Sequence, residues 1–181
     1  MDTTTVRVTA QDMRIAQLAA LAIGIHVLES AFPSLLPGIK PGLANVITLT
    51  VCFLYGWKAA VWVTVLRVLG GSLVVGTFMT PTFALSVSGA AATLICIGLL
   101  LWMGRGGFLG LSPVGVAVLS ALAHMTGQFM VAWALFVPHP AMLTLLPVLL
   151  TAALVFGVIN GVLSHYLLQR LREKNEPSVS L

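Results

Sequence analysis

Residues 83–103 read FALSVSGAAATLICIGLLLWM, a run of 21 residues that contains no charged side chain. A helix needs about 20 mostly apolar residues to cross the hydrocarbon core of a bilayer. The whole chain has this character, because 59% of its 181 residues are apolar and 8% are charged. Soluble domains carry about 25% charged residues, and disordered chains are polar. The composition therefore predicts an integral membrane protein.

The other apolar runs lie at residues 15–32, 43–57, 59–79, 113–137 and 142–168. Prolines and glycines separate the runs, and neither residue type continues a helix well. We predict an all-α, six-transmembrane-helix bundle over residues 15–168, with a cytoplasmic leader at 1–14 and a cytoplasmic tail at 169–181. The run at 43–57 is short for a span, so a re-entrant segment is the alternative there.

Basic residues predict the orientation of the bundle, since Lys and Arg concentrate on the cytoplasmic side of membrane proteins. With both chain ends inside, only Lys40 faces outward, and the cytoplasmic side holds Arg7, Arg14, Lys58, Arg105, Arg170, Arg172 and Lys174. The opposite orientation would invert this ratio. Both termini are therefore predicted to be cytoplasmic, and the even number of spans that this requires favours six spans over a re-entrant second segment.

Polar side chains within the runs gather in one half of the predicted membrane depth, counted at about 1.5 Å per residue. They are Glu29, Asn45, Arg67, His124 and Gln128. Ionisable groups inside a membrane are costly and often mark a substrate pathway. A channel would need polar lining along its whole length. The pattern instead predicts a cup that opens outward, with Lys40 in the loop at its mouth.

Each of these residues also has a purely structural interpretation. Glu29 and Arg67 can neutralise each other to lower the cost of burial. His124 and Gln128 lie one helical turn apart and can form hydrogen bonds between helices. Lys40 can be a solvated loop charge. The sequence leaves both sets of interpretations open.

Two pairs of small residues at i, i+4 spacing predict close approach between helices. Gly157 and Gly161 flank Asn160 in the last run, and we expect helix packing there. Ala16 and Ala20 lie near the cytoplasmic end of the first run. Their small side chains suit close contact with another helix.

The segment PGIKPGLAN at residues 37–45, with Glu29 upstream, resembles the family called heptaprenyl diphosphate synthase component I, also known as the Gx transporter family. Arg67 with the following Gly70 and Gly71 is a further match. The stretch HMTGQ at residues 124–128 is similar to the family's His-Asn-x-Gly-Gln. This family looks like a relative of the substrate-binding S components of energy-coupling-factor (ECF) transporters.

The resemblance implies six helices with both ends in the cytoplasm and an outward pocket capped by the loop between the first two helices. It also implies that an AxxxA motif, which Ala16 and Ala20 match, contacts a coupling transmembrane subunit that works with ABC-type ATPases. We expect a multi-pass protein of a prokaryotic cytoplasmic membrane that binds a small anionic or polar aromatic micronutrient. The expected ligand-binding residues are Glu29, Lys40, Asn45, Arg67, His124 and Gln128.

The enzymatic part of the family's name has no matching motif in this sequence. Prenyl diphosphate synthases use paired aspartates, because magnesium is held through carboxylates and phosphates. The chain has five acids, and no two form such a motif: Asp2, Asp12, Glu29, Glu173 and Glu176. No Walker motif or zinc-ligand spacing is present either, and Cys52 and Cys96 are interpreted as buried thiols. We expect no enzymatic activity, cofactor or metal site.

Two other functions fit the composition. The first is a non-catalytic membrane partner of a prenyl diphosphate synthase of an isoprenoid or quinone pathway. The second is a structural membrane subunit of a redox complex. Nucleic acid is not an expected partner, because most of the basic residues sit at the termini and read as headgroup contacts.

Overall fold

A computed structural model describes residues 9–31 and 42–175 of the chain, and all regular secondary structure in that part is helical. Eight helical elements follow one another: α1 (Ala10–Ala31), α2 (Ala44–Tyr55), α3 (Trp57–Val75), α4 (Pro81–Met103), α5 (Pro113–Val131), the π-helical η1 (Ala132–Phe136), the 3-10 helix η2 (Pro140–Leu145) and α6 (Leu146–Asn175). The two short elements continue α5 and precede α6. The all-helical prediction is therefore confirmed.

Five stretches of helix are long and apolar enough to cross a membrane within the described residues. They contain α1, α3, α4, α5 and α6. By helix length and hydropathy the chain is a multi-pass membrane protein. The exception is α2, whose 12 residues would extend about 18 Å, which is less than the roughly 30 Å of a bilayer's hydrocarbon core.

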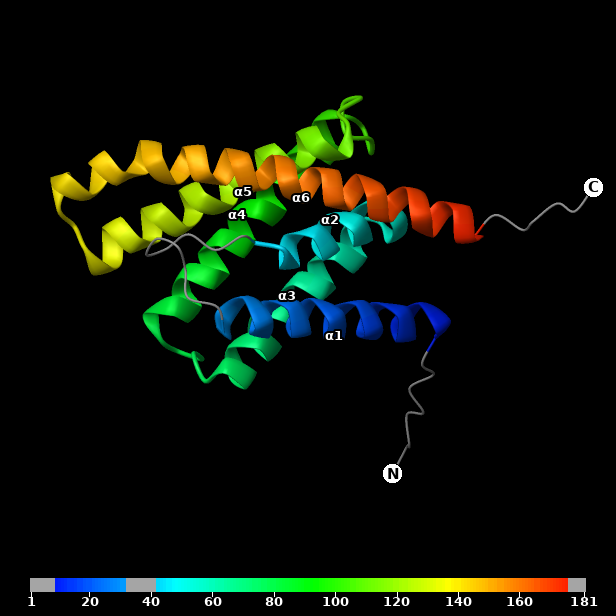
Figure 1. Cartoon of the computed structure of the whole chain (residues 1–181), viewed down its shortest axis with the longest axis horizontal. Coiled ribbons are helices and arrows are strands. Elements are labelled where there is room, and N and C mark those ends of the chain that lie inside the picture. Colours follow the sequence, from blue (N-terminus) through cyan, green and yellow to red (C-terminus); the bar gives the residue numbers. More distant parts are fainter. Residues whose placement is uncertain (1–8, 32–41, 176–181) are drawn as a thin grey trace, which may run out of the picture.

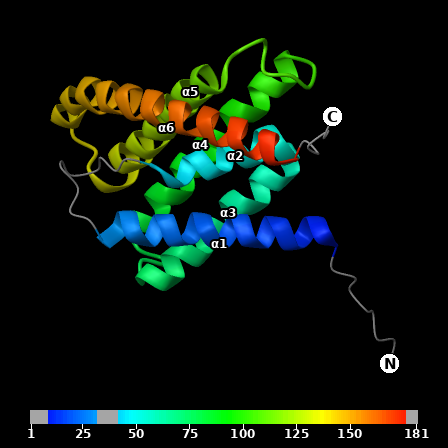
Figure 2. The same ribbon diagram turned by 45° about the vertical axis from the view of Figure 1, so that its right-hand side comes forward.

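Successive α-helices run in alternating directions (Figures 1 and 2). The start of α1, the α2–α3 junction, the α4–α5 connection and the end of α6 lie at one end of the molecule, on the right of both views. The α3–α4 and α5–α6 connections lie at the other end. The basic residues Lys58 and Arg105 follow this division, because they belong to the end where α1 begins and α6 finishes.

The short helix α2 occupies the centre of the bundle. It packs against α1, α3 and α6, and every residue from Ala44 to Cys52 is buried. A single residue, Gly56, joins it to α3 with φ +84°. A residue with a Cβ rarely adopts that conformation, so glycine permits α2 and α3 to fold back on each other without a loop.

Glycines set the spacing between α5 and α6. A Cβ added to Gly161 would lie 2.7 Å from Val114 Cα, and one added to Gly157 would lie 3.0 Å from Val118 Cα. Both neighbours are backbone atoms of α5, which cannot move aside as a flexible side chain could. The pair at i, i+4 spacing therefore lies where two helix backbones meet.

The helix ends differ from the predicted boundaries of the leader and tail. Helix α1 begins at Ala10, inside the predicted leader. Thr9 N–H donates to Asp12 Oδ2 (2.9 Å), and Asp12 N–H donates to Thr9 Oγ1 (3.2 Å). This reciprocal pair is a capping box, which stabilises the start of a helix, so polar residues here begin α1 and do not precede it.

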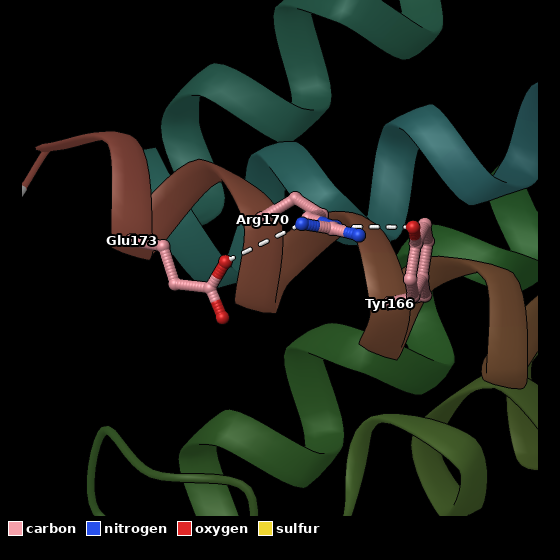
Figure 3. Close-up of polar contacts among 3 residues, drawn as sticks. All are labelled: Tyr166, Arg170 and Glu173. Carbon is pink, nitrogen blue, oxygen red and sulfur yellow. Dashed lines mark hydrogen bonds and ion pairs between the residues drawn. The ribbon is translucent and has the colours of Figure 1, made fainter.

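Helix α6 continues to Asn175, into the predicted tail. Arg170 Nε donates to Tyr166 Oη (3.0 Å), and the guanidinium forms an ion pair with Glu173 at 3.8 Å (Figure 3). Side chains three and four residues apart support a helix in this way even at the surface. The polar composition that predicts a tail therefore forms the last turns of a helix.

We predict that Gly161→Ala destabilises the protein by about 1–3 kcal/mol, because the added methyl group overpacks the α5–α6 contact. Gly24→Ala is the matched control, since a Cβ at Gly24 of α1 meets nothing within 4 Å and alanine favours helix by roughly 1 kcal/mol over glycine. Thermal unfolding in detergent measures both. Equal melting temperatures for the two variants would contradict the proposed contact.

Candidate functional site

Polar side chains of α2 pair with polar side chains of its neighbours. Thr48 Oγ1 and Thr64 Oγ1 of α3 lie 3.2 Å apart, and Thr50 Oγ1 lies 3.2 Å from Ser164 Oγ of α6. In a membrane interior, polar groups that find no water must be satisfied within the protein. These hydrogen bonds hold α2 between α3 and α6 and keep its polar face away from lipid.

Arg67 is the buried cation of this region. It lies near the middle of α3, is only 5% exposed, and donates from Nη1 to Asn45 Oδ1 in the first turn of α2 (3.1 Å). Its Nε has no hydrogen-bond partner among the described residues. A buried guanidinium with an unused donor is costly, and such groups in membrane helices usually belong to functional sites.

Glu29 links the end of α1 to the start of α2. Its Oε1 accepts a hydrogen bond from Leu43 N–H at 2.5 Å, and its carboxylate interacts electrostatically with Arg67. Glu29 therefore has two roles at once. It supplies a negative charge that acts on the buried cation, and it accepts the hydrogen bond from the residue that precedes α2.

His124 of α5 joins the same group from the opposite side. Its Nδ1 lies 3.0 Å from Thr93 Oγ1 of α4, and the imidazole is close enough to Arg67 for the two to interact electrostatically. A Cβ on Gly89 of α4 would lie 2.6 Å from His124 Nε2 and 2.7 Å from Gln128 Cγ. Gly89 thus leaves the space that both side chains of α5 occupy.

The structure brings together Glu29, Asn45, Arg67 and His124, which we call the buried polar cluster, and places Gln128 on the same face of α5 as His124. Lys40 lies outside the described residues. His26 packs its ring against Gly71, where an added Cβ would meet His26 Cδ2 at 2.5 Å.

Thr93 and the hydrogen-bonded threonines of α2 were not predicted from the sequence. The spacing of residues about Gly56 contains a signal for two of the contacts between α2 and α3. The pairs 45–67 and 48–64 are each symmetric about Gly56, as two antiparallel helices joined at one residue require.

The two alanines of the predicted docking motif face away from the bundle. Ala16 and Ala20 are exposed, whereas Ala19 and Ala22, on another side of α1, are buried in the apolar core. Helix α1 packs against α3 and α2 within the chain. Within residues 9–31 and 42–175, Ala16 and Ala20 therefore lie on an exposed side of α1.

The described residues contain no group of three or more His, Cys, Asp or Glu side chains that could hold a metal ion. A cavity of about 510 Å³ lies at the other end of α2, where Gly56 and Trp57 contribute to its wall. The chemistry of the buried polar cluster is therefore that of one cation, one carboxylate, an amide and an imidazole.

A family model described as heptaprenyl diphosphate synthase component I matches residues 18–167. The match covers α2 to α5 entirely, together with most of α1 and α6. No curated protein and no solved structure is similar enough to the chain to match it. The cluster just described lies within the matched residues.

We predict that Asn45→Ala destabilises the protein by about 1–3 kcal/mol or more, because it removes a hydrogen-bond acceptor from a buried charged donor. Thr151→Ala is the control, since the Thr151 hydroxyl donates only to the carbonyl of Val148 in its own helix. Unfolding in mixed micelles with increasing dodecyl sulfate, followed by circular dichroism, gives both free energies. An Asn45→Ala variant as stable as the control would show that this hydrogen bond contributes nothing.

Proposed function

The chain belongs to the heptaprenyl diphosphate synthase component I family, and from this premise and the buried polar cluster we propose that it is the substrate-binding subunit of an ECF-type uptake transporter. Its ligand is a small anionic or polar aromatic micronutrient. The ligand enters a pocket that faces the outside of the cell. The protein itself is not an enzyme, and its energy comes from partner subunits.

The observation that carries this proposal is the position of Arg67 beside the first turn of α2. The N-terminal end of a helix carries a partial positive charge, and the Arg67 guanidinium adds a full one through its contact with Asn45. Transporters place interrupted helices so that such ends meet the anionic groups of substrates. An unpaired Nε on a 5% exposed side chain is a donor available for such a group.

The length of α2 supports the same site. The 12 residues of α2 place its start about 18 Å from the α2–α3 junction, a little over half of the roughly 30 Å hydrocarbon core. If the α2–α3 junction lies at one membrane surface, α2 begins near the middle of the bilayer, and other segments must cover the rest of the bilayer thickness. Glu29 accepts a hydrogen bond from Leu43 N–H just before α2. In this position its carboxylate can orient a bound ligand or, by repulsion of an anion, help to release it.

The orientation follows from the distribution of basic residues. Lys58, Arg105 and the basic end of α6 share one end of the molecule with the start of α1. The concentration of Lys and Arg on cytoplasmic surfaces supports placing this end inside the cell. We therefore propose a six-span arrangement with cytoplasmic termini, in which the short α2 counts as the second pass, in the cytoplasmic membrane of a prokaryote.

The proposed partner is a coupling transmembrane subunit bound to ABC-type ATPases. Ala16 and Ala20 support its docking on α1, because they are exposed and lie toward the proposed cytoplasmic end. Small residues at i, i+4 spacing let two membrane helices approach closely. The alternative function is a non-catalytic membrane partner of a prenyl diphosphate synthase, which the name of the family favours.

We predict that Arg67→Gln weakens ligand binding more than tenfold, which corresponds to about 1.4 kcal/mol, because it removes the buried positive charge. Native mass spectrometry of the detergent-purified protein should detect a retained small molecule on the wild type and on Arg172→Gln, a control at an exposed cation. The same molecule should be absent from Arg67→Gln. Equal retention by a folded Arg67→Gln variant would remove Arg67 from the binding site.

We predict that affinity-purified protein carries ABC-type ATPases with it, and that Ala16→Leu together with Ala20→Leu abolishes this association by blocking close helix contact. Leu21→Ala, at an exposed position of the same helix, is the control and should keep the association. Recovery of a soluble prenyl diphosphate synthase in place of the ATPases would favour the alternative function.

A further inference from the structure

A second site lies at the opposite end of α2 from the buried polar cluster. The cavity there has a volume of about 510 Å³, within the range of about 300–1,000 Å³ typical of small-molecule sites. Its walls come from α2, α3, α4 and the α4–α5 connection. Nothing in the proposed uptake function uses this space, which we call the interfacial groove.

The lining of the interfacial groove is aromatic and glycine-rich. Phe53 and Phe108 pack with ring centroids 4.3 Å apart, and Trp57 and Trp102 complete the aromatic wall. Gly106 provides surface without a side chain, whereas the Trp57 ring packs against Gly98, where an added Cβ would meet Trp57 Cη2 at 3.1 Å. A wall built mostly of aromatic rings suits a flexible hydrocarbon chain, which gains free energy by leaving any remaining water contact.

The groove lies where a membrane protein meets lipid headgroups. Trp57 is the first residue of α3, and Trp102 is next to the last residue of α4. Trp102 is 78% exposed. Tryptophans at helix ends mark the boundary between hydrocarbon and headgroups. An occupant held here can therefore keep an apolar part in the groove and a polar part at the membrane surface.

Two exposed cations are sequence neighbours of residues that line the groove. Lys58 follows Trp57 and Arg105 precedes Gly106, and both are exposed. None of the groove-lining residues is acidic. The charged side chains next to the lining residues are thus complementary to an anion.

We propose that the interfacial groove is a binding site for an anionic phospholipid of the surrounding leaflet. One acyl chain lies among Phe53, Trp57 and Phe108, and the phosphate lies between Lys58 and Arg105. A zwitterionic lipid satisfies the apolar walls equally well but carries no net charge for the two cations. The site therefore selects by headgroup charge, and it does so independently of the ligand pocket.

Tryptophan quenching by brominated lipids tests this proposal. The Trp62→Phe, Trp133→Phe background leaves Trp57 and Trp102 as the only tryptophans. Brominated phosphatidylglycerol should quench their fluorescence with an apparent affinity at least about fivefold higher than that of brominated phosphatidylcholine, as two cations near a membrane surface would produce.

In this background, the double substitution Lys58→Gln, Arg105→Gln should bring the ratio of apparent affinities for phosphatidylglycerol and phosphatidylcholine close to one. Arg14→Gln with Arg172→Gln removes the same charge at exposed positions that are not adjacent in sequence to any residue lining the groove, and this pair should keep the preference. Should the first pair fail to fold, each single substitution is expected to reduce the preference on its own.

Equal quenching by the two lipids would overturn the proposal, and so would a preference that survives the loss of both cations. Light scattering can also detect a dimer of the protein. A dimer that requires Trp102 and prevents quenching by both lipids would overturn the proposal, because a second copy would then occupy the groove.

Discussion

The structure depends on keeping a short polar-faced helix at the centre of a membrane bundle. Helix α2 buries Asn45, Thr48 and Thr50 together with its apolar residues. Buried polar groups in a membrane bundle need hydrogen-bond partners from the protein, so α3 and α6 must place polar side chains opposite those of α2. The hydrogen bonds to Arg67, Thr64 and Ser164 do this. The hydrogen bonds required by the buried polar side chains of α2 therefore constrain where α3 and α6 pack.

The two ends of α2 create two different environments. At its start, a guanidinium, a carboxylate and an imidazole gather among apolar helices, where burying charge is costly. At its end, the direct turn at Gly56 brings aromatic rings together beside a cavity. One helix, shorter than the five candidate spans, thereby separates a polar region from an aromatic groove.

Much of this organisation could be predicted from the sequence, and the limits have clear physical causes. Residues 83–103 predict a span, and helix α4 covers them. Arg67, Asn45 and Glu29 could be assigned to one region by counting depth, which works because helices rise evenly. Their pairing could not be predicted, because it depends on which helices are neighbours. The helices extend beyond the apolar runs because polarity does not prevent a helix: the Thr9–Asp12 cap and the Tyr166–Arg170–Glu173 contacts stabilise helical turns within the predicted leader and tail.

The sequence by itself determined that this chain is a helical membrane protein, since hydrophobicity is a local property and a backbone in lipid must satisfy its own hydrogen bonds. It also determined the family, which its residues resemble and the family model confirms. The central position of α2 and the aromatic groove beside Gly56 depend on how the helices pack. The same is true of His124, which contacts Thr93 and occupies the space that Gly89 leaves open. These features arise between segments distant in the chain, where packing selects the partners.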